Sequence, residues 1–187
     1  MEFLTELWVP IVVSALVVWF ASFAMWMLFP HHKSEWKGIS DEKGFRGALI
    51  ELGLGSGQYV FPYAPDPGKL KDPEYKEYYE KGGPHGHLVI WRGLPNMGAN
   101  MIKTLVLLLL LGAFLAYIGH YALPKGERYL KVFQVIGTAA ILAHTFSNLF
   151  HSIWFAKPAR AMFTEFFDGV VYGLLTAGVF GWLWPEA

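Results

Sequence analysis

The chain of 187 residues contains no cysteine. This absence excludes disulfides, thiolate zinc sites, iron–sulfur clusters, covalently attached c-type haem and cysteine nucleophiles. The sequence also lacks the G-x-S-x-G, G-x-x-x-x-G-K-[ST] and H-E-x-x-H patterns, which mark serine hydrolases, P-loop nucleotide sites and zinc metalloproteases. The familiar catalytic motifs therefore give no support for an enzyme.

Charged residues are also scarce, at 16% of the chain against about 25% in a typical soluble domain. Lys+Arg and Asp+Glu balance at 15 each, so no excess positive charge indicates a nucleic-acid partner. Hydrophobic residues reach 54% and aromatic residues 17%, with eight tryptophans. This composition, gathered into long apolar runs, predicts a multi-pass protein of the lipid bilayer.

Four apolar runs are each long enough to cross about 30 Å of hydrocarbon. They cover residues 7–29, 104–123, 130–155 and 162–184. We predict an all-α transmembrane four-helix bundle with a first span in residues 1–30, a soluble insert in 31–100 and three further spans in 101–187. A cleaved signal peptide is the alternative for the first run, but Glu2 and Glu6 precede it and no Lys or Arg does.

The insert carries its own structural signals. Ser40 is expected to cap a short helix, and Asp72-Pro73 is a typical helix start, with a capping residue before a proline. The segments GQYVFPY (57–63) and HLVIWRG (87–93) are rich in β-branched and aromatic residues, which predicts two short strands. We therefore expect a small α+β insert between spans one and two.

Positive residues near the span ends indicate the orientation, because cytoplasmic loops carry an excess of Lys and Arg. The insert and the connection at 156–161 carry more of them than the opposite side, where only Lys125, Arg128 and Lys131 occur. We expect residues 31–100 to face the cytoplasm and both termini to lie outside.

The third run is apolar enough to span a membrane but carries many polar residues. These are Gln134, Thr138, His144, Thr145, Ser147, Asn148, His151 and Ser152. At 100° per residue they fill one half of the helix. An unpaired polar group in hydrocarbon costs several kcal/mol, so we expect this half to face protein.

The fourth run carries small residues at every fourth position, Gly169, Gly173, Ala177 and Gly181. Such a ridge allows two helix backbones to approach closely, as in right-handed crossings of membrane helices. Because the connection between the third and fourth runs is short, we expect these two helices to pack against each other.

Polar residues of the third and fourth runs form the candidate site. They are His144, Asn148, His151, Glu165, Asp168 and Tyr172. Depth matching predicts a buried His151–Asp168 pair with a layer of His144, Asn148 and Tyr172 beneath it. One interpretation is a proton relay, a quinone site or a metal site. The other is structural, in which these groups pair with one another and fix the helix register.

Other histidines offer further alternatives. His31-His32 and His85-x-His87 flank the predicted membrane and are either metal ligands or solvated interfacial residues. A bis-histidine haem between His120 and His144 is disfavoured, because the two residues are expected at different depths on antiparallel helices. The sequence identifies no cofactor.

Four motifs together resemble a family. They are HHKSEWKGISDE, GQYVFPY, GLPNMG, and SIWFAKP followed by FDGVVYGLLTAGVFGWLWP. They are similar to those of an uncharacterised family of small four-span bacterial membrane proteins. The resemblance implies the fold and a location in the bacterial inner (cytoplasmic) membrane. It implies no activity and no site residue, because that family has no established function.

Two functional classes remain. The first is a non-enzymatic membrane protein, an accessory or scaffolding subunit that associates with other membrane subunits or with copies of itself. The second is a small transport or redox element that uses the His144, His151 and Asp168 face. A stoichiometric partner after native purification would favour the first class, and a quinone or metal bound against His144 would favour the second.

Overall fold

The computed structural model describes residues 2–187 and divides into two compact units. A helical unit comprises residues 2–37 and 96–187, and an insert unit comprises Gly38–Pro95. The predicted boundary at residue 30 differs from this division, because residues 31–37 belong to the helical unit. The contacts of His31 and His32 described below account for that difference.

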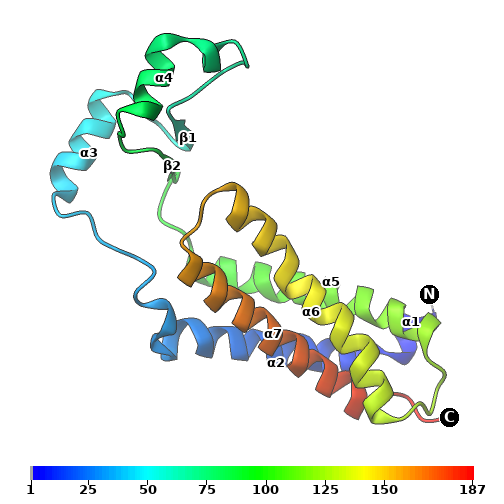
Figure 1. Ribbon diagram of the computed structural model, residues 1–187. Coiled ribbons are helices and arrows are strands. Elements are labelled where there is room, and N and C mark those ends of the chain that lie inside the picture. Colours follow the sequence, from blue (N-terminus) through cyan, green and yellow to red (C-terminus); the bar gives the residue numbers. More distant parts are fainter. Residues whose placement is uncertain (1) are drawn as a thin grey trace. The chain divides into compact units, whose positions relative to one another are not determined.

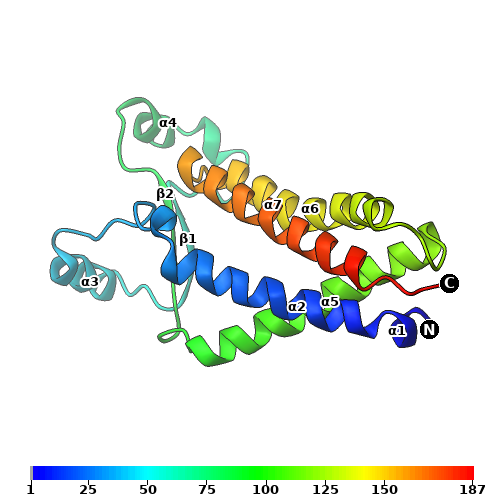
Figure 2. The ribbon, with the colours of Figure 1, turned by 90° about the horizontal axis from the view of Figure 1, so that it is seen from below.

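The helical unit contains four helices that are long and apolar enough to cross a membrane. The short α1 (Glu2–Glu6) precedes α2 (Trp8–Phe23), which continues through a π-helical turn, η1 (Ala24–Leu28). The other three long helices are α5 (Met97–Ala122), α6 (Tyr129–Trp154) and α7 (Ala159–Trp182). Figures 1 and 2 show the two termini at one end of this unit, beside the connection between α5 and α6.

The hydrophobic core lies at the end of the helical unit that holds the termini. Its buried residues come from the start of α2, the end of α5, the start of α6 and the end of α7, and include Leu7, Leu115, Val132, Ile136 and Phe180. The C-terminal tail closes this end, since the Trp184 indole donates a hydrogen bond of 2.9 Å to the carbonyl of Pro124.

α6 and α7 pack along each other, and the small-residue ridge of α7 lies in this contact. A Cβ atom built on Gly173 would lie 2.5 Å from the Ile141 side chain, and one on Gly169 would lie 2.8 Å from the carbonyl oxygen of His144. Ala177 is fully buried and meets Gly137 of α6. Only small residues allow the backbones of α6 and α7 to approach each other this closely.

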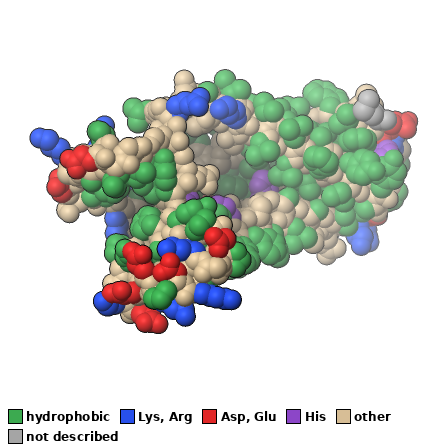
Figure 3. Space-filling model, turned by 90° about the horizontal axis from the view of Figure 1, so that it is seen from above, with side chains coloured by type: hydrophobic (Ala, Val, Ile, Leu, Met, Phe, Trp, Pro, Cys, Tyr) green, Lys and Arg blue, Asp and Glu red, His purple; other side chains and the backbone are tan. Residues whose placement is uncertain are grey.

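The outward flank of the helical unit is mostly apolar. In Figure 3 hydrophobic side chains cover most of the visible flank of the long helices. Large exposed side chains include Phe20, Leu107, Phe114, Phe150 and Trp154, with exposed fractions between 62% and 84%. A soluble monomer rarely exposes apolar surface on this scale.

The insert unit contains α3 (Glu42–Glu51), the strands β1 (Gly57–Phe61) and β2 (Gly86–Ile90), the short η3 (Lys69–Lys71) and α4 (Pro73–Glu80). The strands are antiparallel, with Tyr59 opposite Leu88. The predicted start of α4 is confirmed, because the Asp72 carboxylate accepts a hydrogen bond from the Glu74 amide. The predicted cap of α3 is wrong by one residue, since Asp41 and not Ser40 accepts from the Gly44 amide at 2.9 Å.

Candidate functional site

The end of α2 turns the chain back toward α7. Phe29 is extended, with φ −81° and ψ 142°, and Pro30 opens the 3₁₀ turn η2 (Pro30–His32). A residue before proline is driven out of the helical region by contact with the proline ring, and proline has no N–H to continue the helix. The turn brings the two histidines that follow Pro30 against α7.

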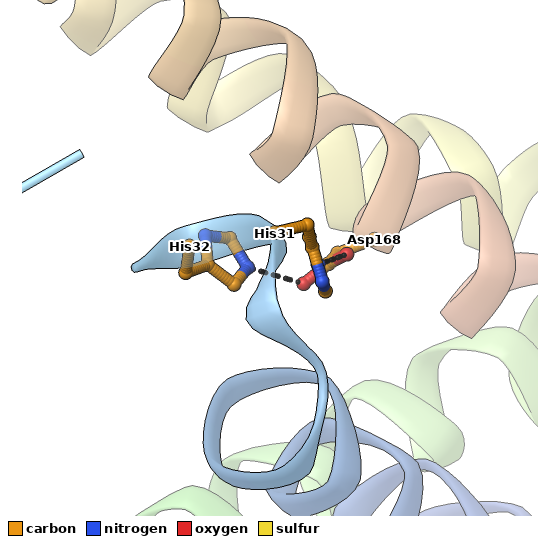
Figure 4. A group of neighbouring side chains, drawn as sticks. All are labelled: His31, His32 and Asp168. Atoms are coloured by element: carbon orange, nitrogen blue, oxygen red, sulfur yellow. Dashed lines mark hydrogen bonds and ion pairs between the residues drawn. The ribbon is translucent and has the colours of Figure 1, made fainter. Parts of the chain in front are cut away.

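His31 and His32 share the carboxylate of Asp168 (Figure 4). The Nε2 atom of His31 lies 3.0 Å from Oδ1, and the Nε2 atom of His32 lies 2.9 Å from Oδ2. The Asp168 and His32 side chains are 4% and 5% exposed, whereas the His31 side chain is 25% exposed. The Asp168 carboxylate thus contacts two imidazoles, of which His32 is buried and His31 is partly exposed.

The other side of the His32 ring is also held. Its Nδ1 atom lies 2.9 Å from Oε1 of Glu35, which accepts a further hydrogen bond from the hydroxyl of Thr164 on α7. The indole of Trp26 stacks on the His32 ring, with centroids 3.9 Å apart and planes 8° apart. The ring is therefore fixed by both nitrogens and one face.

These contacts set the charge of the cluster when no metal is bound. Burial lowers the pKa of His32, but the hydrogen bonds to Asp168 and Glu35 outweigh it and raise the pKa above 6.5. Burial likewise opposes the charged form of Glu35, yet the Thr164 and His32 hydrogen bonds hold the pKa of Glu35 below its usual value. Both carboxylates therefore favour the protonated form of His32, in which each ring nitrogen can donate to one of them.

The cluster continues inward along α7. The Tyr172 hydroxyl donates to Oδ2 of Asp168 at 3.3 Å, and the Tyr172 ring lies edge-to-face with His144, at a centroid distance of 5.8 Å. His144 lines a cavity of about 10 Å³ together with Ser14 of α2 and Thr176 of α7. The proximity of His144 and Tyr172 agrees with the predicted layer.

Two of the predicted buried residues are exposed, which corrects the expectation for α6. Asn148 and His151 are exposed, and the His151 ring stacks on Phe155. The predicted His151–Asp168 pair is wrong, because His31 and His32 occupy both carboxylate oxygens. Glu165 is partly buried and pairs with Lys157. The buried part of α6 centres on other residues, among them Thr145 and Ser152.

The sequence prediction also missed the partners of Asp168. The sequence offers His31-His32 as metal ligands or as solvated interfacial residues, but not as partners of Asp168, and Glu35 carries no motif of its own. A signal is nevertheless present, because His31-His32 follows span one and Asp168 lies near the start of span four, on the same predicted side of the membrane. Matching of depths between neighbouring helices alone does not find this pair.

The remaining histidines do not form comparable groups. Within residues 2–187, His31, His32 and Asp168 are the one group of three His or carboxylate residues whose ligand atoms all lie within 4.8 Å of one another. The His85 ring contacts the Tyr78 carbonyl at 3.1 Å, and His120 lies 3.7 Å from Glu6 near the N-terminus. The chemistry available to the chain is therefore concentrated at Asp168.

The arrangement of His31, His32 and Asp168 can hold a proton or a cation between two imidazoles and a carboxylate.

Comparisons of the chain with protein-family models, with curated proteins and with solved structures find no match.

Proposed function

We propose that the protein is a non-enzymatic, multi-pass membrane protein that acts as an accessory or scaffolding subunit, and that it assembles with a second copy of itself through α6. The observation that carries this proposal is a row of polar residues on α6, of which the chain leaves Ser147, Asn148 and His151 exposed. We define the α6 polar stripe as His144, Ser147, Asn148 and His151.

The membrane location is supported by length and composition. Four helices of 21 to 26 residues reach mean hydropathies of 1.2 to 2.3, and their outward side chains are largely apolar. We propose the bacterial inner membrane, with the insert in the cytoplasm and both termini outside. The positive residues Lys33, Lys37, Lys157 and Arg160 at the insert end support this orientation.

The α6 polar stripe follows the spacing i, i+3, i+4 and i+7, which places its members on one face of the helix. His144 is half-buried, whereas Ser147, Asn148 and His151 are exposed. Within residues 2–187, neither the Ser147 nor the Asn148 side chain makes a hydrogen bond in the chain itself. Such groups in hydrocarbon cost several kcal/mol, so a partner that covers them is strongly favoured.

The chemistry of the stripe fits a second copy. The Asn148 amide and the Ser147 hydroxyl each both donate and accept hydrogen bonds. A two-fold axis along the membrane normal brings each residue to the same residue of the other copy at the same depth. Interhelical contacts of this kind contribute about 0.6 kcal/mol each, and up to about 1.7 kcal/mol.

The absence of cysteine gives a direct test, since any introduced thiol is the only one in the chain. Ser147→Cys places a thiol on the stripe, and Phe146→Cys places one at nearly the same depth about 100° away. In native membranes we expect disulfide-linked dimers with Ser147→Cys and little product with Phe146→Cys.

Equal yields from the two positions, or no dimer from either, would contradict self-association through this face. Mass spectrometry of the gently extracted protein gives the complementary measurement. A different protein bound in stoichiometric amount would replace the second copy as the occupant and leave the accessory role standing.

A further inference from the structure

We propose that His31, His32 and Asp168 bind one divalent first-row transition-metal ion, of which Zn²⁺ is the convenient probe. This site goes beyond the proposed assembly role and does not depend on it. The three proposed ligands lie on η2 and α7, and none of them belongs to the α6 polar stripe.

The donor atoms already converge. One ligand atom each of His31, His32 and Asp168 lies within 4.8 Å of the other two, and the two Nε2 atoms lie 3.0 and 2.9 Å from Oδ1 and Oδ2 of the Asp168 carboxylate. Ligand atoms about 2.0–2.2 Å from a tetrahedral zinc ion are separated by about 3.3–3.5 Å. The three side chains are therefore gathered on a scale close to that of a zinc site.

The donors are also oriented as metal ligands usually are. A metal-bound imidazole almost always gives its other N–H to a carboxylate or carbonyl, which fixes the tautomer and the ring plane. Glu35 takes this place at Nδ1 of His32, 2.9 Å away, and Trp26 stacks on the ring. Asp168 is itself supported by the Tyr172 hydroxyl.

Charge balance favours an ion over a purely structural clamp. The carboxylates of Asp168 and Glu35 meet at the two nitrogens of the His32 ring, and the His31 ring lies beside it with centroids 4.2 Å apart. Buried charged groups are usually paired with an opposite charge or with a metal ion. A divalent ion with two neutral imidazoles balances both carboxylates.

The ligand set points to the class of ion and leaves room for a further ligand. Imidazole suits zinc, copper, iron and nickel, whereas Mg²⁺ and Ca²⁺ prefer sites made of oxygen. Two histidines and one carboxylate leave a coordination position for water or another small ligand. The partial exposure of His31 provides access for the ion from the surface.

The test uses the full-length protein in detergent or nanodiscs, stripped of metal with a chelator and titrated with Zn²⁺ by calorimetry. We expect one Zn²⁺ per chain at this site and at least 10-fold weaker binding in His31→Gln, with Mg²⁺ showing no binding. Co²⁺ titration adds a spectroscopic reading, because its visible absorption reports the coordination directly.

The matched control is His85→Gln with His87→Gln, the other closely spaced pair of histidines. We expect this double variant to bind Zn²⁺ as the unmodified chain does. Zn²⁺ binding that disappears in the double variant, or that His31→Gln leaves unchanged, would overturn the proposal.

A second variant separates ligation from folding. Glu35→Gln keeps all three ligands but removes the charge behind His32, and loss of such support typically weakens metal binding by about 10- to 100-fold. Helical content by circular dichroism identifies variants that fold. Because His31 is the exposed ligand, His31→Gln keeps the proposal testable even where an Asp168 variant fails to fold. Unchanged affinity in folded Glu35→Gln protein would contradict the orienting role of Glu35.

Discussion

α6 and α7 pack along each other, and both are long apolar helices that carry polar residues. Several polar residues of α7 are buried, whereas several of those on α6 are exposed. Thr164, Asp168 and Thr176 of α7 are buried, and each has a hydrogen-bond partner in the chain. Ser147 and Asn148 of α6 are exposed. Within residues 2–187, no buried polar side-chain atom is left without a partner. Composition alone therefore does not distinguish a polar group that the chain satisfies from one that needs a second molecule.

The largest effect is expected at Asp168. Asp168→Ala removes the carboxylate that both histidines share, and breaking a buried ion pair typically costs about 3–5 kcal/mol. We expect a loss of this size in the free energy of unfolding, measured by denaturant titration in detergent without metal. Glu165→Ala on the same helix is the control, because its pair with Lys157 is less buried. If the two variants lost the same free energy of unfolding, the buried Asp168 pair would be no more important for stability than the more exposed Glu165 pair.

The next effect concerns the close contact between α6 and α7. Gly173→Ala adds a methyl group where Ile141 already lies 2.5 Å away, and overpacking of this kind costs about 1–3 kcal/mol. Gly178→Ala is the matched control on the same helix, since its nearest neighbour would be the Tyr129 hydroxyl at 3.7 Å. Thermal unfolding should separate the two variants clearly. A tolerated Gly173→Ala would mean that the helices can move apart.

A smaller effect, and one of different kind, is expected on α6. Asn148→Leu replaces an exposed amide by an apolar side chain, so the single chain should keep its stability within about 0.5 kcal/mol. The same variant should lose dimer, because the hydrogen bonds between copies are gone. Unfolding at high dilution in detergent reports the first quantity, and crosslinking through Ser147→Cys reports the second. A large loss of stability in the dilute chain would place Asn148 inside the fold.

The smallest effect is expected near the N-terminus. Glu6 accepts a hydrogen bond of 2.6 Å from Lys125, which raises the pKa of this lysine above 10.5. Both side chains are accessible to solvent, and exposed ion pairs contribute little. Lys125→Met should leave the melting temperature unchanged at neutral pH, in contrast to Asp168→Ala. A marked shift would show that this pair belongs to the buried core.

Local sequence rules predicted much of the architecture. Four long apolar runs became α2 with η1, α5, α6 and α7. The two predicted strands begin within one residue of β1 and β2, and their predicted ends lie two and three residues too far along the chain. Asp72 caps α4 as expected, because capping depends on a few neighbouring residues. The small residues at positions 169 to 181 indicated a close helix contact, because their spacing is a property of one helix.

The candidate site was only half predictable. Asp168 and Tyr172 were identified as a buried ionisable residue and its neighbour, but Asp168 was paired with His151 on the adjacent helix. Its partners His31 and His32 depend on where Phe29 leaves the helix and on how α2 packs against α7. The face of α6 that is buried depends likewise on the crossing of three helices, and helical periodicity in one sequence does not determine that crossing.

The shared carboxylate also has a consequence for biosynthesis. His32 and Asp168 are 136 positions apart, and their contact joins the first long helix to the last. A ribosome has almost finished the chain before α7 emerges, so the histidine pair waits for its acidic partner until every other helix has been made. Premature termination before residue 168 leaves two imidazoles without that carboxylate, and the junction after the first long helix closes only once α7 has been made.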